Sequence, residues 1–168
     1  MRSLLLAASV VVFGTCALAA EPNPLPNKFL TAQPGEWIIV GDIENPGETT
    51  RLSIIARGVE GGEDYVLLRR EKFDADGNVV EKKDHRVKMK RYQERLDRIN
   101  ERAYRITREK IGFQDEEITV YTAEWESERI DGELKIWISP DIPVSGFFRL
   151  WSSDPDFPTY ELIEYGRD

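Results

Sequence analysis

A row of arginines is the clearest set of side chains in this sequence that would bind a charged ligand. Their spacings of 4, 3, 4 and 3 residues place them on one face of a helix. The row consists of Arg91, Arg95, Arg98, Arg102 and Arg105. Guanidinium groups bind phosphate and carboxylate oxygens through paired hydrogen bonds. We expect Arg95, Arg98 and Arg102 to contact anions, either lipid head groups on a membrane surface or an acidic protein.

The same row is also typical of the solvated flank of a helix. Glu94 lies four residues before Arg98, and Glu101 lies four before Arg105. Opposite charges at this spacing support an exposed helix, and long arginine stems cover apolar surface while their charged ends stay in water. Nucleic acid is not expected as the partner, because the chain has a net charge of −8.

Aromatic residues in two predicted strands form a second candidate contact surface. Residues 134–138 and 147–151 are apolar on both faces, so a single helix cannot cover all of them. We expect Trp137, Phe148 and Trp151 to contact an apolar ligand on a concave sheet. The alternative is that these rings fill the core of the sheet.

Other residues give little support for catalysis. The segment from Asp74 to Asn78 has acidic residues like a calcium loop, but position twelve is His85, and Asp-Gly-Asn is typical of a tight turn. His85 follows Asp84 in a charged strand, and no Gly-x-Ser-x-Gly motif is present. We expect no cofactor, no metal and no enzyme activity. A hydrolase with a pair of carboxylates is the remaining alternative.

The elements that position these residues follow from periodicity. Five apolar residues share one helical stripe, which predicts a long amphipathic helix near 89–111 that ends before Gly112. They are Tyr92, Leu96, Ile99, Ala103 and Ile106. About eight short strands flank this helix, and 65–73 with 79–88 form the clearest hairpin. We predict an α+β fold: a single curved antiparallel sheet, like a half-barrel, with one helix across it.

The N-terminus has the pattern of an export signal. Arg2 precedes an apolar run from Leu4 to Phe13, and Ala17-Leu18-Ala19 fits a peptidase site. We predict a signal peptide over 1–19, a proline-rich extended lead-in over 20–35 and one domain over 36–168. The protein is then periplasmic or secreted. A lipoprotein anchored through Cys16 is the alternative.

Charge is unevenly distributed along the chain. Residues 82–110 contain 12 basic and 5 acidic side chains, a net charge of +7, between two acidic segments. This asymmetry indicates either a surface for an acidic partner or a basic helix that packs against an acidic remainder.

Two stretches resemble a loose group of uncharacterised secreted bacterial β-sheet proteins. The first is Pro34-Gly35-Glu36-Trp37. The second follows the pattern Trp-x-Ser-x-x-x-Pro-x-x-Gly over residues 137–146 and continues into Phe147-Phe148-Arg149 and the closing Tyr160-Glu161-Leu162-Ile163. The order of strands is also similar to the half-barrels of periplasmic lipoprotein carriers. The resemblance implies an exported sheet protein and no catalytic residue.

Together these patterns predict a non-enzymatic envelope protein. It would bind an apolar or lipid-like ligand or another envelope protein, and would contact an anionic membrane surface peripherally. The alternative is a structural or assembly subunit in which the helix stripe (Tyr92, Leu96, Ile99) docks on a partner. The oligomeric state does not follow from the sequence.

Overall fold

The computed structural model describes residues 24–127, 130 and 132–168. The predicted signal peptide, Cys16 and the first residues of the predicted lead-in lie outside this part of the chain. The described residues form one short 3-10 helix, one α-helix and nine strands. These are η1 (Lys28–Leu30), β1 (Glu36–Asp42), β2 (Thr49–Glu60), β3 (Glu63–Phe73), β4 (Val79–Lys88), α1 (Met89–Arg102), β5 (Arg105–Phe113), β6 (Glu116–Ser127), β7 (Gly132–Ile138), β8 (Phe147–Ser152) and β9 (Tyr160–Arg167).

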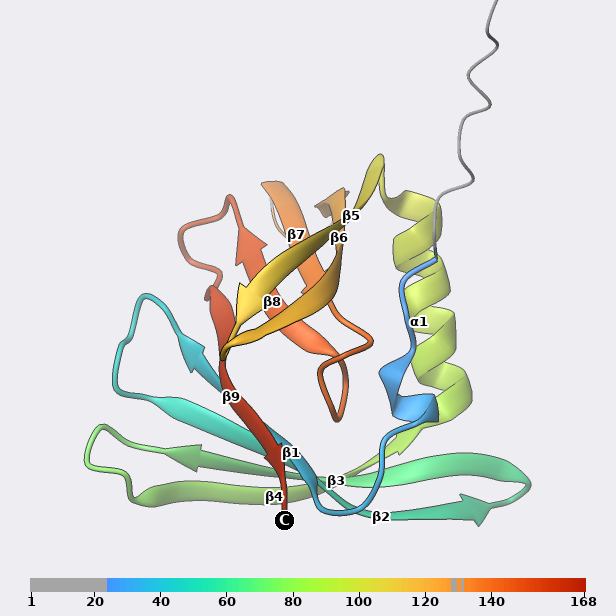
Figure 1. Ribbon diagram of the computed structural model, residues 1–168, viewed down its shortest axis with the longest axis vertical. Coiled ribbons are helices and arrows are strands. Elements are labelled where there is room, and N and C mark those ends of the chain that lie inside the picture. The colour runs from blue at the N-terminus through green and yellow to red at the C-terminus, as the bar shows by residue number, and fades with distance from the viewer. Residues whose placement is uncertain (1–23, 128–129, 131) are drawn as a thin grey trace, which may run out of the picture.

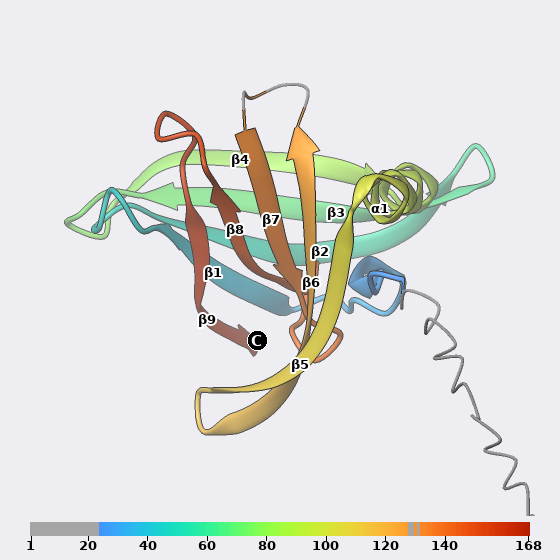
Figure 2. The same ribbon diagram turned by 90° about the horizontal axis from the view of Figure 1, so that it is seen from above.

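All nine strands belong to one antiparallel sheet. Its order is β4-β3-β2-β1-β9-β8-β7-β6-β5, so the first and last strands pair in the middle. Consecutive strands β4 and β5 lie at opposite edges, and α1 connects them. The sheet curves so that α1 lies between these edges and contacts β3, β4 and β6 (Figures 1 and 2). The structure confirms the prediction of a curved antiparallel sheet with one helix.

The predicted hairpin is confirmed. β3 and β4 pair along their length, and the turn is held by the Asp74 carboxylate, which accepts hydrogen bonds from the backbone N–H groups of Asp76 (3.0 Å) and Asn78 (2.8 Å). His85 is exposed on β4 opposite Leu68. Among the residues with described positions, no group of three His, Cys, Asp or Glu side chains could hold a metal.

The predicted helix near 89–111 is too long. Helix α1 ends at Arg102, Ala103 has extended backbone angles, and residues 105–113 form β5 instead. This strand raises the count from about eight to nine. Ile106, expected in the helix stripe, pairs with Ala123 of β6. Ile106 packs in the same apolar cluster as Leu96 and Ile99, but it does so from a strand. Its spacing of three residues from Ala103 therefore wrongly indicated a continued helix. No glycine or proline marks the end of the helix, whereas β-branched Ile106, Thr107 and Ile111 favour a strand.

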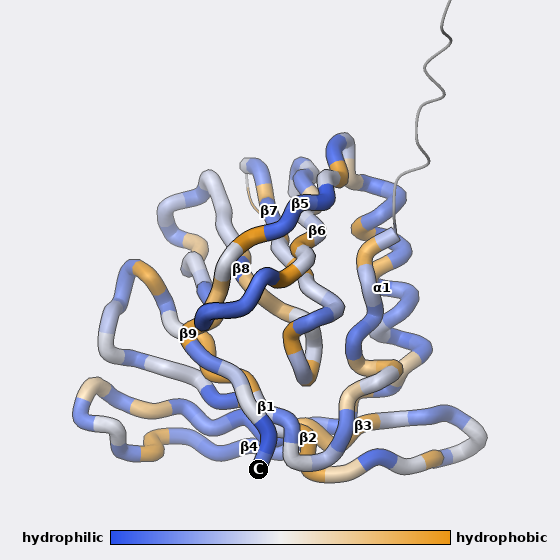
Figure 3. Tube along the Cα trace, in the orientation of Figure 1, coloured by the Kyte–Doolittle hydropathy of each residue, from blue (hydrophilic) through white to orange (hydrophobic). Residues whose placement is uncertain are grey.

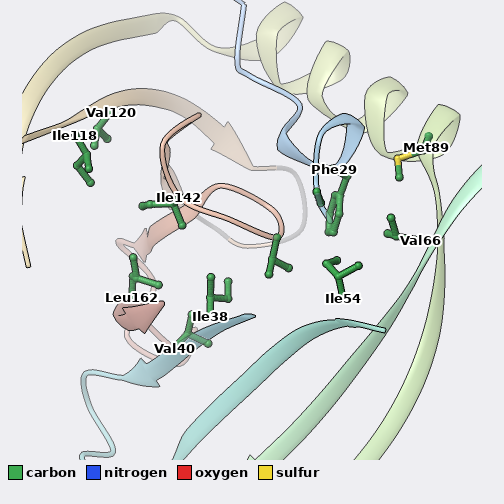
Figure 4. Close-up of a cluster of buried hydrophobic side chains, with 12 residues drawn as sticks. Phe29, Ile38, Val40, Ile54, Val66, Met89, Ile118, Val120, Ile142 and Leu162 are labelled. Atoms are coloured by element: carbon green, nitrogen blue, oxygen red, sulfur yellow. The ribbon is translucent and has the colours of Figure 1, made fainter. Parts of the chain in front are cut away.

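The space enclosed by the sheet is filled by the chain itself. The β7–β8 loop (139–146) enters the middle of the molecule and buries Ile142 and Val144 completely (Figures 1 and 4). Phe29 and Ala32 of the N-terminal segment belong to the same core cluster. This core also includes Ile38 of β1, which is likewise fully buried. The middle of the enclosed face is therefore filled by side chains of the chain itself.

The β7–β8 loop is fastened at several points. The Asp141 carboxylate accepts the backbone N–H of Thr119 at 2.7 Å, and Glu36 accepts that of Val144 at 3.3 Å. Gly146 has a φ of +72°, and a Cβ there would lie 2.6 Å from the backbone oxygen of Ser139. Only glycine fits this position, which explains the last residue of the Trp-x-Ser-x-x-x-Pro-x-x-Gly pattern.

The described part of the segment predicted as an extended lead-in contributes buried side chains to the core. It contains η1, and Leu25 and Phe29 are each 3% exposed. Phe29 packs edge-on against Tyr92 of α1 with ring centroids 4.6 Å apart. The Arg57 guanidinium donates to the backbone oxygens of Leu30 and Ala32. These contacts join the N-terminal segment to both the helix and β2.

Candidate functional site

An open hollow lies between α1 and the strands β6 and β7, and we call it the arginine hollow. It has a volume of about 660 Å³. Its lining residues are Arg95, Arg98, Ile99 and Arg102 of α1, Trp125 and Ser127 of β6, and Leu134 of β7. The structure thus brings together all three arginines that the sequence nominates for anion contact. It adds an aromatic ring and two aliphatic side chains beside them.

The position of the hollow follows from how α1 packs. The helix stripe faces the sheet, where Leu96 (1% exposed) meets Ala123 of β6 and Ile138 of β7. Burial raises the pKa of Tyr92 to about 12, and the nearby charge of Arg95 opposes this rise. The arginines are offset by one residue from the buried stripe, so they lie on the flank of the helix beside β6. Most of α1 is hydrophilic (Figure 3).

The two central arginines are available for a ligand. Arg95 and Arg98 are exposed, and neither forms an ion pair within the described part of the chain. The predicted Glu94–Arg98 support is therefore not present. Arg105 lies on β5, where its guanidinium is 3.9 Å from the Glu124 carboxylate, so the predicted Glu101–Arg105 pair does not form on the helix either.

An acidic hollow adjoins the arginine hollow and shares Ser127 with it. Its other lining residues are Tyr104, Glu126, Gly132 and Glu133, and its volume is about 400 Å³. Tyr104 donates a hydrogen bond to the Glu133 carboxylate, which raises the pKa of Tyr104 to about 12. The two hollows have opposite charge, so an anionic group is attracted to the arginine hollow and repelled by the acidic hollow.

The aromatic residues nominated by the sequence lie elsewhere. Trp137 and Trp151 share one face of β7 and β8, and each ring is covered by a cation at 5.5 Å: Arg149 over Trp137 and Lys135 over Trp151. Phe148 packs edge-on against Phe113 with centroids 5.5 Å apart.

These three rings therefore do not converge on one described hollow. The aromatic ring that lines the arginine hollow is Trp125, which the sequence analysis did not nominate. Its place in the same hollow as Arg98 depends on how α1 crosses β6, and no local signal encodes that crossing.

The side chains of the arginine hollow are suited to binding an anionic ligand through charge, hydrogen bonds and apolar contact. Guanidinium groups stay charged and donate hydrogen bonds, and Trp125, Ile99 and Leu134 provide apolar contact. His85 lies on β4, away from these residues. In the described residues no helix is long and apolar enough to cross a membrane.

The fold and this site define an open antiparallel sheet protein with a cationic, partly apolar hollow beside its helix. Comparison of the sequence with protein-family models, with curated proteins and with solved structures finds no match.

Proposed function

We propose that this protein is a non-enzymatic binding module for an anionic, lipid-like ligand, held in the arginine hollow. The observation that carries the proposal is the convergence of Arg95, Arg98 and Arg102 with Trp125 and Leu134 around one hollow. The exposed guanidinium groups of Arg95 and Arg98 suit a phosphate head group. The apolar side chains suit the first part of an acyl chain.

The ligand binds beside the sheet and not within it. In a carrier of the half-barrel type, the enclosed face would hold the ligand. Here Phe29, Ile142 and Val144 occupy that face and are almost fully buried. The export signal predicted over 1–19 supports a periplasmic or secreted location, where anionic lipids of the envelope are the nearest source of such a ligand.

The helix stripe is a poorer basis for function than the arginine flank. Tyr92, Leu96 and Ile99 pack against the chain's own core, so a partner that docked on this stripe would first have to displace β6 and β7. No described segment covers Arg95 and Arg98 in this way, since both are exposed, and this difference favours ligand binding over assembly through the helix.

Titration with dodecyl phosphate by calorimetry tests the proposal. We expect saturable binding that weakens about tenfold or more in the double variant Arg95→Gln/Arg98→Gln, because each charge-assisted hydrogen bond contributes about 1.5–3 kcal/mol. The matched control is Lys90→Gln/Arg91→Gln, which removes the same charge from the same helix outside the hollow. Equal weakening in both variants would show unspecific attraction and reject the site.

A second arm separates a free ligand from a membrane surface. Vesicles of phosphatidylglycerol and of phosphatidylcholine are sedimented with the protein. Sedimentation with phosphatidylglycerol alone, lost in Arg95→Gln/Arg98→Gln, places the head group in a bilayer. Binding of dodecyl phosphate without sedimentation indicates a ligand taken up as a single molecule.

A further inference from the structure

A second cleft opens on the opposite side of the molecule from α1, where β1–β3 face β8 and β9. We call it the strand cleft. Its volume is about 310 Å³, within the lower range of small-molecule sites. Its walls are apolar or aromatic on one side and cationic on the other. The residues used here are Val40, Leu52, Phe147, Tyr160, Arg70 and Lys72.

The strand register places both cations on the core face of the sheet. Ile38 pairs with Leu52, and Leu52 pairs with Arg70. Two residues further along the strands, Val40 pairs with Thr50, and Thr50 pairs with Lys72. Directly opposed residues point to the same side of a sheet. Arg70 and Lys72 therefore share the face of buried Ile38 and Val40, where the packed core ends.

The charges in the strand cleft are only partly compensated. The Arg70 guanidinium donates from Nη2 to the Glu81 carboxylate at 3.0 Å, while its Nε is buried and has no acceptor. Glu81 also pairs with Lys83. Lys72 is exposed and forms no ion pair with any residue whose position is described. Arg70 and Lys83 thus share the Glu81 carboxylate, and the hollow that adjoins the strand cleft at Lys72 is also lined by Asp42, Glu48 and Asp74.

We propose that the strand cleft binds a monocarboxylate with an apolar body, such as a medium-chain fatty acid. The carboxylate lies between Lys72 and Arg70, and the chain runs along Leu52, Val40 and the rings of Phe147 and Tyr160. A single negative charge matches this cleft because Glu81 already neutralises much of Arg70. The arginine hollow, where Arg95 and Arg98 are both exposed, matches a phosphate head group. The two sites are separate, so this inference does not rest on the proposed function.

Calorimetric titration of the full chain with decanoate tests the strand cleft. We expect saturable binding of one decanoate, and no saturable binding of decyltrimethylammonium, which has the same chain with the opposite charge. Lys72→Gln is expected to weaken decanoate binding about fivefold to tenfold. Lys82→Gln is the matched control, because Lys82 is also exposed and pairs with Glu71 on the other face of the same hairpin.

Two further measurements complete the test: the binding of a carboxylate with a shorter alkyl chain, and the binding of decanoate to a variant of the arginine hollow. Acetate should bind at least tenfold more weakly than decanoate, since the apolar walls contribute most of the affinity. The Arg95→Gln/Arg98→Gln variant should bind decanoate like the parent protein. Absence of saturable decanoate binding, or equal loss in Lys72→Gln and Lys82→Gln, would overturn the inference. Loss only in Arg95→Gln/Arg98→Gln would also overturn it, because the decanoate would then occupy the arginine hollow.

Discussion

The enclosed face of the sheet and the arginine hollow combine similar side chains with opposite results. Both contain aromatic and aliphatic side chains that strands contribute. On the enclosed face these strands lie next to a loop, and in the arginine hollow they lie next to α1. On the enclosed face, the β7–β8 loop and the N-terminal segment bury Ile142, Val144 and Phe29. Beside α1, Trp125 and Leu134 are only partly buried and line the arginine hollow. Whether an apolar surface becomes core or site depends here on whether a loop of the same chain reaches it.

Removal of a side chain from the β7–β8 loop should have the largest effect on stability. Ile142→Ala deletes fully buried carbon atoms and leaves a cavity, so we expect a loss of about 3–4 kcal/mol in the free energy of unfolding. Urea denaturation followed by tryptophan fluorescence measures it. Ile43→Ala, at a side chain 44% exposed, should change stability by less than about 0.5 kcal/mol. Similar losses in the two variants would mean that the loop does not belong to the core.

The turn into β8 gives the next largest effect. Gly146→Ala combines a positive φ with a Cβ 2.6 Å from the Ser139 backbone oxygen, so a loss of about 2–3 kcal/mol is expected. Gly77→Ala has a similar φ of +80° but no atom within 4 Å of the new Cβ. It should cost only about 1 kcal/mol, the strain of the backbone alone. Thermal denaturation of both variants isolates the cost of the close contact.

Alkaline pH should lower the free energy of unfolding through Tyr92 of α1. Its folded pKa of about 12 lies above the ordinary value of 10.0, so its contribution is complete below pH 10 and is lost as the pH rises toward 12. The expected loss is about 2 kcal/mol. Unfolding free energies at pH 9 and pH 11.5 should differ less in Tyr92→Phe than in the parent. An unchanged difference would show that Tyr92 is not buried against η1.

The arginine hollow should give the smallest effect on stability. Arg95→Gln/Arg98→Gln removes two exposed side chains without ion pairs in the described chain, so we expect a change below about 0.5 kcal/mol by urea denaturation. A large loss would assign these arginines to the support of the helix. A small loss, together with weaker binding of dodecyl phosphate, would assign them to a ligand.

Local patterns predicted much of the fold. Alternation and the Asp-Gly-Asn turn located β3 and β4, and the apolar stripe located the start of α1. The end of α1 was missed because Ile106 has the right helical spacing yet serves the same cluster from β5. The arginine spacing correctly placed Arg95, Arg98 and Arg102 on one side. It did not reveal the residue facing them, because the crossing of α1 over β6 is set by packing between distant segments.

The sequence by itself determined the elements of this protein whose cause is local: antiparallel strands, one amphipathic helix and a cationic flank. Dihedral preferences, turn residues and the periods of strand and helix act over a few neighbours. The tertiary structure alone decided that residues 139–146 fill the enclosed face, that Trp125 and Arg98 line the same hollow, and that Arg70 and Lys72 share a face with Val40. These outcomes depend on strand register and on competition between segments for the same apolar surface, and both are properties of the whole packed chain.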